Sequence, residues 1–191
     1  VQKLREMTFI TGFPIARILL SLASNRLSHW QAGIQIPMAL LELRELKTAL
    51  DQGHRLLGLD LGKKTIGLAL SDTSLTVATP LKTLKRGKFT TDADTLSALV
   101  ADFGIGGLIV GLPLNMDGSA GRAAQSARAF TRNFAGRSQI PLAMVDERLS
   151  TVAAEKAMLM VDTSRKKRAK TMDKVAAAYI LQGALDQLRN L

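Results

Sequence analysis

The stretch Leu56-Leu57-Gly58-Leu59-Asp60-Leu61-Gly62 predicts a buried strand that ends in a carboxylate. Side chains alternate between the two faces of a strand, so the odd-numbered leucines share one face and Asp60 lies on the other. Burial of a lone carboxylate is costly, and Asp60 therefore needs a cation, hydrogen-bond donors or an opening to water. Because Asp also caps hairpin turns, and Gly62 allows a turn at once, this stretch alone does not decide between a ligand and a turn residue.

Glu147 ends a second apolar segment, 141–147, which also predicts a strand. Strand alternation puts its side chain on the face opposite Asp146, so only one of these two neighbours can join Asp60. The alternative is that one of the two acids forms a surface ion pair with Arg148. As a carboxylate at a strand end, Glu147 is the second candidate ligand.

Asp173 opens the alanine-rich segment 173–181, which predicts a helix. It shares a stripe with the small residues three and four positions later, and small side chains let a helix lie close to a sheet. The alternative role is that of a first-turn acid that complements the helix dipole. If folding brings Asp173 to Asp60 and Glu147, the three carboxylates suit divalent metal ions.

The composition favours a polyanionic partner. The 191-residue chain has 26 Lys and Arg against 16 Asp and Glu, a net charge of +10, which favours nucleic acid over an acidic membrane surface. The absence of cysteine excludes disulfides and thiolate metal sites, and the two histidines lie too far apart to suggest a zinc site. No apolar run reaches the length of a membrane span. We therefore expect a cytoplasmic protein that does not enter a membrane.

Residues 1–37 differ from the rest of the chain. They hold four basic residues and one acid, which leaves a net charge of +7 on the remainder, so the basic character does not depend on them. We hypothesise that Met38 is the natural start and that 1–37 form an extension outside the natural product. An amphipathic pattern from 39 to 50 predicts a short helix, which with its linker forms residues 38–55, and residues 56–191 form the main domain.

The order of predicted elements indicates the fold class. Three consecutive strands precede an alternation of helix and strand, and this order predicts an α/β fold with a mixed five-stranded sheet and helices on both faces. Pro80 indicates an edge position or a bend in the third strand. The expected strands cover 56–61, 65–71, 77–84, 107–110 and 142–147, and the expected helices cover 91–103, 120–134, 151–160 and about 171–188.

Two further segments suit phosphate groups. The loop 111–118 follows a buried strand, has glycine at both ends and contains Asn115, which can donate hydrogen bonds, although it lacks the Gly-Lys-Ser/Thr of a P-loop. The densest basic run, 165–170, lies just before Asp173. Either segment would usually be a plain, solvated loop. The basic run, however, lies beside the candidate metal ligand Asp173, and this position favours a nucleic-acid contact.

Four motifs, in order along the chain, resemble the YqgF/RuvX family of pre-16S ribosomal RNA nucleases. They are Gly58-Leu59-Asp60-Leu61-Gly62-Lys63-Lys64-Thr65-Ile66-Gly67 with Ser71-Asp72, the loop Val110-Gly111-Leu112-Pro113-Leu114-Asn115-Met116-Asp117-Gly118, the segment Asp146-Glu147-Arg148-Leu149-Ser150-Thr151, and Asp173 with Ala176-Ala177 and Ile180-Leu181-Gln182. Together they cover about residues 56–188. The family often has Arg after the first Lys of its opening motif, where this chain has Lys64, and residues 1–37 resemble no part of its motifs.

The resemblance implies an RNase H-like fold of the RuvC type, in which Asp60, Glu147 and Asp173 form the catalytic set. We interpret these carboxylates as ligands of Mg²⁺ or Mn²⁺, with Asp60 between two ions and the other two residues on one ion each. Because three carboxylates are few for two ions, a site with one ion and a site completed by a second copy of the chain stay open as alternatives. The expected activity is metal-dependent endonucleolytic processing of the 5′ end of pre-16S rRNA during ribosome biogenesis. The expected phosphate contacts, which carry no sequence preference, are Lys63, Lys64, Asn115, Arg148, Arg165, Lys166, Lys167, Arg168 and Lys170.

Two other functions stay open at this point. The same fold could serve a non-catalytic factor that binds rRNA or a ribosome-assembly partner, or a DNA endonuclease that acts on branched DNA such as a Holliday junction. An ATP-handling enzyme of the actin or sugar-kinase type is disfavoured, because it requires two such domains and this chain is too short for both. The expected partners are structured RNA and the ribosome precursor, and the expected state is a monomer or a homodimer.

Overall fold

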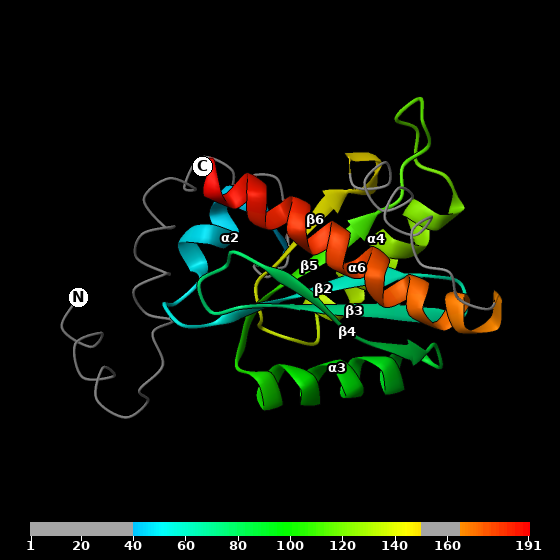
Figure 1. Ribbon diagram of the computed structural model, residues 1–191, viewed down its shortest axis with the longest axis horizontal. Coiled ribbons are helices and arrows are strands. Elements are labelled where there is room, and N and C mark those ends of the chain that lie inside the picture. The colour runs from blue at the N-terminus through cyan, green and yellow to red at the C-terminus, as the bar shows by residue number, and fades with distance from the viewer. Residues whose placement is uncertain (1–39, 150–164) are drawn as a thin grey trace. The chain divides into compact units, whose positions relative to one another are not determined.

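A six-stranded mixed sheet forms the centre of the computed structural model, which describes residues 40–149 and 165–191 (Figure 1). The strand order is β1-β6-β5-β2-β3-β4. The neighbours β1–β6, β6–β5 and β5–β2 are parallel, and the neighbours β2–β3 and β3–β4 are antiparallel. The strands are β1 (Leu40–Leu41), β2 (Arg55–Leu61), β3 (Thr65–Ser71), β4 (Ala78–Lys85), β5 (Ile105–Leu112) and β6 (Leu142–Asp146). The helices are α2 (Leu43–Ala49), α3 (Phe89–Phe103), α4 (Arg122–Ala135) and α6 (Arg165–Arg189), and a 3₁₀ turn, η3, covers Glu147–Leu149.

The expected mixed sheet is confirmed, and a short sixth strand adds to the five that the sequence predicted. Leu40 and Leu41 pair with Leu142 and Ala143 at the edge of the sheet. The prediction of one helix over 39–50 is therefore wrong in extent, because these first residues satisfy the unpaired edge of β6. The helix starts only after Glu42, whose backbone N–H donates to the Glu45 carboxylate as part of a capping box.

The two hairpins β2–β3 and β3–β4 also follow the prediction. Asp60 pairs with Gly67 across the first hairpin. Pro80 lies in the edge strand β4, opposite Ala69, where the register shifts by a residue. An edge strand and an irregular register are the positions in which a sheet tolerates a residue without a backbone N–H.

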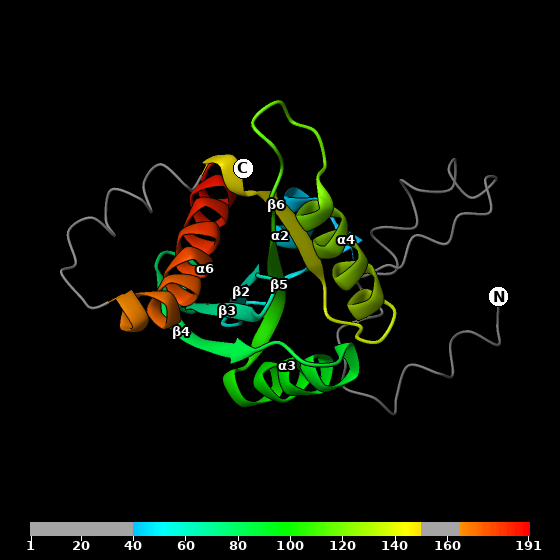
Figure 2. The ribbon, with the colours of Figure 1, turned by 90° about the vertical axis from the view of Figure 1, so that its right-hand side faces the viewer.

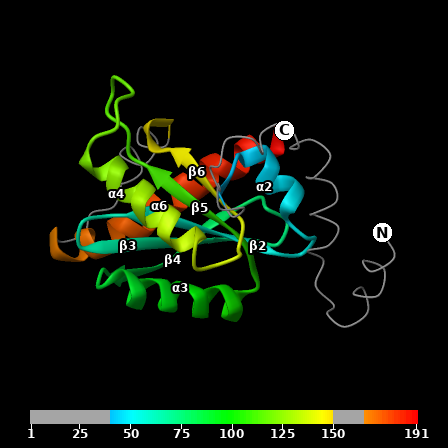
Figure 3. The same ribbon diagram turned by 180° about the vertical axis from the view of Figure 1, so that it is seen from behind.

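Helices cover both faces of the sheet, as expected. Figure 2 shows α6 on one side of the strands and α3 and α4 on the other, and Figure 3 shows the α3–α4 side from behind. The odd-numbered leucines of β2 pack in the core under α3 and α4, with Leu96 and Phe134. Leu56 belongs to the opposite core, under α6, with Ala177 and Leu181. The strand alternation in 56–61 thus assigned both faces correctly.

The last helix is longer than the sequence indicated. It begins at Arg165 rather than near 171, so the basic run 165–170 forms helix backbone instead of a loop. The predicted helix over 151–160 and the proposed extension 1–37 lie outside the described residues. Within the described ranges, none of the helices combines the length and the apolar character that a membrane span needs.

Candidate active site

One edge of the sheet collects the ends of three parallel strands. β2, β5 and β6 run in the same direction, so Asp60, the loop after Leu112 and Glu147 all emerge at their carboxyl ends. The start of β3 lies at this edge too, because the turn 62–64 reverses the chain directly after β2. The carboxyl edge of parallel strands is where ligand sites of α/β sheets form.

Asp173 reaches this edge because α6 lies unusually close to β3. A Cβ atom added to Gly67 would lie 2.0 Å from the carbonyl oxygen of Asp173, a distance that only a glycine permits. Gly67 is the residue that pairs with Asp60. Asp173 is the ninth residue of α6, more than two turns after Arg165, so a role in complementing the helix dipole at the N-terminus is excluded.

A second glycine makes room for Glu147. Glu147 opens η3 directly after β6, and a Cβ atom added to Gly111 would lie 2.1 Å from its Oε1 atom. The same Cβ would be 2.8 Å from Ile180 of α6. Glu147 therefore extends over β5 on the α6 side of the sheet, which is the face that strand alternation predicted.

The three carboxylates interact electrostatically. Burial, and then the negative charge of Asp173, raise the pKa of Asp60 from 3.8 to about 6. Burial, and then the charges of Asp60 and Asp146, raise the pKa of Glu147 from 4.5 to about 7. Among the described residues, no hydrogen bond or ion pair stabilises the Asp60 carboxylate. In the described part of the chain, Asp60 therefore interacts with two other acids and with no basic partner.

The donor set fits a divalent metal ion in its chemistry. Carboxylate oxygens are the ligands that Mg²⁺ and Mn²⁺ prefer, and a cation would relieve both the burial cost and the repulsion at Asp60. Over the described ranges, no three Asp, Glu, His or Cys side chains lie close enough together to share one ion. Simultaneous coordination by all three carboxylates therefore requires side-chain rotation toward a common centre.

Arg148 forms an ion pair at this edge with the neighbour of Glu147. Its guanidinium donates to both oxygens of Asp146, with Nη2 to Oδ2 at 2.6 Å and Nε to Oδ1 at 3.1 Å. The surface ion pair that the sequence left open is thus present. Arg148 Nη1 also lies 3.5 Å from the carbonyl oxygen of Met116, so the pair connects β6 to the loop after β5.

Asn115 organises the loop that carries it. Its Nδ2 atom donates to Ser119 Oγ at 2.8 Å, and Ser119 in turn donates through both its backbone N–H and its hydroxyl to Asp117. Gly118 has a φ of +83°, which closes the turn in a conformation that favours glycine. This network leaves Met116 at the tip, 91% exposed.

The predicted lysines occupy the turn beside Asp60. Lys63 and Lys64 are both exposed, as a phosphate contact requires. The side chains of 165–170 lie outside the described residues, so the structure does not place the remaining predicted contacts.

Arg86 was not predicted as a site residue, although the sequence shows a basic turn at 85–88. Its Nη1 atom donates to the carbonyl oxygen of Gly62 at 2.7 Å, and its backbone N–H donates to that of Lys64 at 2.8 Å. Its guanidinium lies over the ring of Phe130 in α4, 5.8 Å from the centroid. Arg86 therefore holds the lysine turn against α4. The steric role of Gly67 was also missed, and its only signal was a glycine inside an otherwise apolar strand. Gly111 was predicted to approach phosphate, and the structure shows that it makes room for Glu147.

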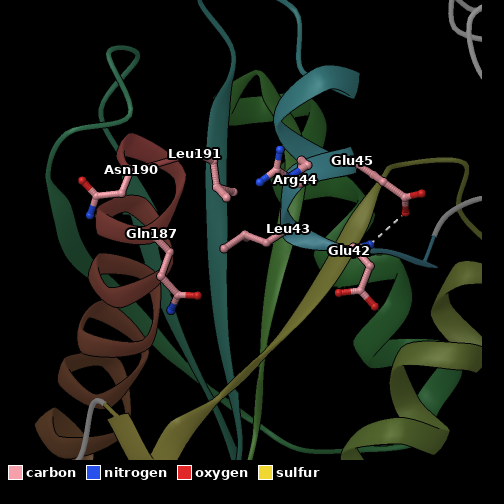
Figure 4. A pocket seen from close by; sticks show the side chains of 7 residues that line it. All are labelled: Glu42, Leu43, Arg44, Glu45, Gln187, Asn190 and Leu191. Atoms are coloured by element: carbon pink, nitrogen blue, oxygen red, sulfur yellow. Dashed lines mark hydrogen bonds between the residues drawn. The ribbon is translucent and has the colours of Figure 1, made fainter.

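The hollow in Figure 4 lies elsewhere in the molecule. It has a volume of about 700 Å³ and is lined by Glu42, Leu43, Arg44, Glu45, Gln187, Asn190 and Leu191. Gln187 is fourteen residues after Asp173 in α6, which corresponds to roughly 20 Å along the helix axis. The hollow is therefore separate from the carboxylates.

The chain is similar in sequence to a known protein family and to curated proteins, and it is similar in structure to solved proteins. The model of a family described as "RuvX: Holliday junction resolvase" matches residues 54–187. A curated protein of Roseobacter denitrificans named "Putative pre-16S rRNA nuclease" is 58% identical over 154 residues, which cover 80% of this chain and 94% of the relative. A protein of the same name from Paramagnetospirillum magneticum is 55% identical over 149 residues and covers 78% of this chain and 96% of its own length.

Two solved structures show a more remote likeness. Thermus thermophilus RuvC in complex with a Holliday junction substrate has a TM-score of 0.48 at 15% identity, covering 71% of this chain and 96% of that one. The Holliday junction resolvase of yeast mitochondria has a TM-score of 0.40 at 14% identity, covering 78% of this chain and 87% of that one.

Proposed function

The chain belongs to the RuvX family, and on this premise we propose that it is a divalent-metal-dependent endonuclease that processes the 5′ end of precursor 16S rRNA. The names of the relatives from Roseobacter and Paramagnetospirillum support the substrate. The observation that carries the chemistry is the partly buried carboxylate of Asp60, which interacts electrostatically with the carboxylates of Glu147 and Asp173.

The proposed roles follow from the position of each side chain. Asp60, Glu147 and Asp173 would hold Mg²⁺ or Mn²⁺, which supplies an activated water and stabilises the leaving oxygen when bound. The raised pKa values of Asp60 and Glu147 mean that both acids exchange protons near neutral pH, so activity should rise as the pH increases from about 6 to 8. Lys63 and Lys64 would attract phosphates to the edge where the acids meet.

The position of Arg148 changes its proposed role. The guanidinium of Arg148 already forms an ion pair with Asp146. We therefore propose that Arg148 mainly holds the loop through the carbonyl of Met116 and contributes little to nucleic-acid binding. The run 165–170 keeps its proposed role as a phosphate contact, supported by its charge and by its position in the two turns before Asp173. We expect the protein to act in the cytoplasm on the ribosome precursor, as a monomer or a homodimer.

Substitution of the central carboxylate tests the proposal. The Asp60→Asn variant keeps the shape of the side chain but loses its charge, and we expect cleavage of a precursor 16S rRNA fragment to fall about 1,000-fold or more. Asp102→Asn removes an exposed carboxylate from α3 and is the matched control, with wild-type cleavage expected. Both rates are measured with Mg²⁺ or Mn²⁺ from the ends of the product RNA. Undiminished cleavage by a folded Asp60→Asn protein would refute the proposed site.

A second candidate substrate is branched DNA. The printed description of the family, "Holliday junction resolvase", favours it. The same assay with a four-way DNA junction distinguishes the RNA substrate from the DNA substrate. The proposed enzyme should cleave the RNA at a defined position and should cleave the junction much more slowly. Binding of the RNA with no cleavage under any metal would instead identify a non-catalytic assembly factor.

A further inference from the structure

The outer surface of α4 is basic along its whole length. Its three charged residues are Arg122, Arg128 and Arg132, and all three are exposed. The helix contains no acid, and no ion pair engages any of these arginines within the described residues. The opposite face is apolar and packs on the sheet through Ala127, Phe130 and Phe134, among others.

Helix stability explains only Arg132, which lies in the last turn of α4, where the helix dipole favours a cation. Arg122 is the first residue of α4, where the positive end of the helix dipole disfavours a cation. Arg128 and Arg132 are four residues apart, a spacing at which like charges repel on a helix surface. An ordinary solvent-facing helix would intersperse acids among these residues. The charge pattern therefore indicates an anionic partner.

The position of α4 links this surface to the carboxylates. The helix follows the loop after β5 and so begins at the edge where Asp60 and Glu147 lie. Arg86 joins the two, since it holds the carbonyl of Gly62 in the lysine turn, packs over Phe130 and approaches Ser126 of α4 at 3.5 Å. From Arg122 to Arg132 the helix advances about 15 Å away from that edge.

Two described acids near the ends of α4 are engaged by other groups. Asp94 of α3 pairs with Arg137, which follows α4, at 2.5 Å, and Asp117 in the loop before α4 accepts hydrogen bonds from Ser119. Lys85 and Lys88, on either side of Arg86, are exposed and extend the positive surface toward the lysine turn.

The side chains also indicate the form of the nucleic acid. Proteins that bind single strands stack bases on exposed aromatic rings. In the described part of the chain, the exposed large apolar residues are Val77, Met116, Met172 and Leu191, with no aromatic among them. The exposed side chains of α4 are arginines and uncharged residues without an aromatic ring, a surface that suits the phosphates of a duplex, whose bases are already stacked.

We propose that the outer surface of α4 binds a double-stranded arm of the RNA substrate through its phosphates and directs it away from the cleavage site. This inference rests on the proposed nuclease function and adds the substrate class: an RNA in which a duplex flanks the cleaved bond.

A triple substitution tests this surface. The variant Arg122→Gln/Arg128→Gln/Arg132→Gln removes three charges and keeps good helix formers. The control Arg44→Gln/Lys82→Gln/Arg189→Gln removes the same charge from exposed positions on α2, β4 and the end of α6. Binding of an RNA hairpin and of a single strand of equal length is measured without divalent metal at several salt concentrations. Cleavage of the hairpin-flanked precursor is measured separately at saturating substrate.

We expect the α4 variant to bind the hairpin about tenfold more weakly and to reduce the slope of log K against log salt by about 2–3, with single-strand binding unchanged. Its kcat should equal that of the wild type, and the control should behave as the wild type throughout. An unchanged salt slope, an equal loss for the single strand, or tighter α4-dependent binding of a DNA duplex would overturn the inference. Failure of the wild type to cleave any RNA would instead count against the proposed function.

Discussion

The two faces of the sheet are built in opposite ways. On the α3–α4 side, large side chains such as Leu59, Leu96 and Phe134 fill the space between helix and strand. On the α6 side, the strands carry Gly58, Gly67 and Gly111 where the helix or Glu147 comes closest.

The difference separates stability from geometry. Large buried side chains contribute most to the free energy of folding, because that energy scales with the apolar area removed from water. Glycines contribute little of it, but they let the backbone of α6 approach β3 closely enough to bring Asp173 near Asp60. The α6 side also has a hydrophobic core, with Leu56, Ile109 and Leu181, so it stabilises the fold and positions the acids, whereas the α3–α4 side only stabilises the fold.

The largest expected effect is on stability, from a cavity on the α3–α4 side. Leu96 is fully buried, and we expect Leu96→Ala to lower the free energy of unfolding by about 2–5 kcal/mol. The kcat of the remaining folded protein should not change, because α3 carries none of the three carboxylates Asp60, Glu147 and Asp173. Urea denaturation and cleavage assays check both, with Leu96→Met as the volume-conserving control. A loss of kcat as large as the loss of stability would remove the distinction between the faces.

The next effect is on activity, from a methyl group on the α6 side. Gly67→Ala must displace the backbone of α6 at Asp173, and we expect cleavage to fall about 100-fold. Gly106→Ala is a suitable control, since its Cβ would also lie too close to a neighbour, at 2.6 Å from His54, but at the start of β5. The two variants are compared by kcat at equal folded fraction. If Gly67→Ala were fully active, close packing of α6 would not be what positions Asp173.

The smallest effect is a pH-dependent gain in stability. The pKa of Asp60 is higher in the folded protein than the ordinary value of 3.8, so this carboxyl favours folding at low pH and opposes it as the pH rises through about 6. In metal-free buffer, Asp60→Asn should match the wild type near pH 4 and exceed its free energy of unfolding by about 1–3 kcal/mol at pH 8. The control is Asp102→Asn, which removes an exposed carboxylate from α3. Equal stabilities of Asp60→Asn and wild type at pH 8 would mean that neither burial nor the charge of Asp173 destabilises the Asp60 carboxylate.

Much of the fold was predictable because its signals are local. Alternation of apolar residues in 56–61 is a property of one strand, and it assigned the odd-numbered leucines and Asp60 to the correct faces. The same alternation placed Glu147 on the α6 side. The start of α6 was missed, because nothing in the composition of 165–170 distinguishes a basic helix from a basic loop.

The candidate site was predictable only in part. The identity of the three acids followed from their positions at element ends and from the family motifs. The role of Arg86 did not, because its hydrogen bond to Gly62 joins residues 24 positions apart and its stacking on Phe130 joins two layers. Likewise, the ion pair of Asp146 with Arg148 was one of several that the sequence allowed.

By itself, the sequence determined five of the six strands, the faces of their side chains and which acids are candidate ligands, since these depend on short-range periodicity and residue type. The tertiary structure alone decided how closely these residues approach. Asp173 lies near enough to Asp60 to interact electrostatically because a helix more than a hundred positions later packs against a glycine in the neighbouring strand. That contact is set by steric fit between distant segments, which no local pattern encodes.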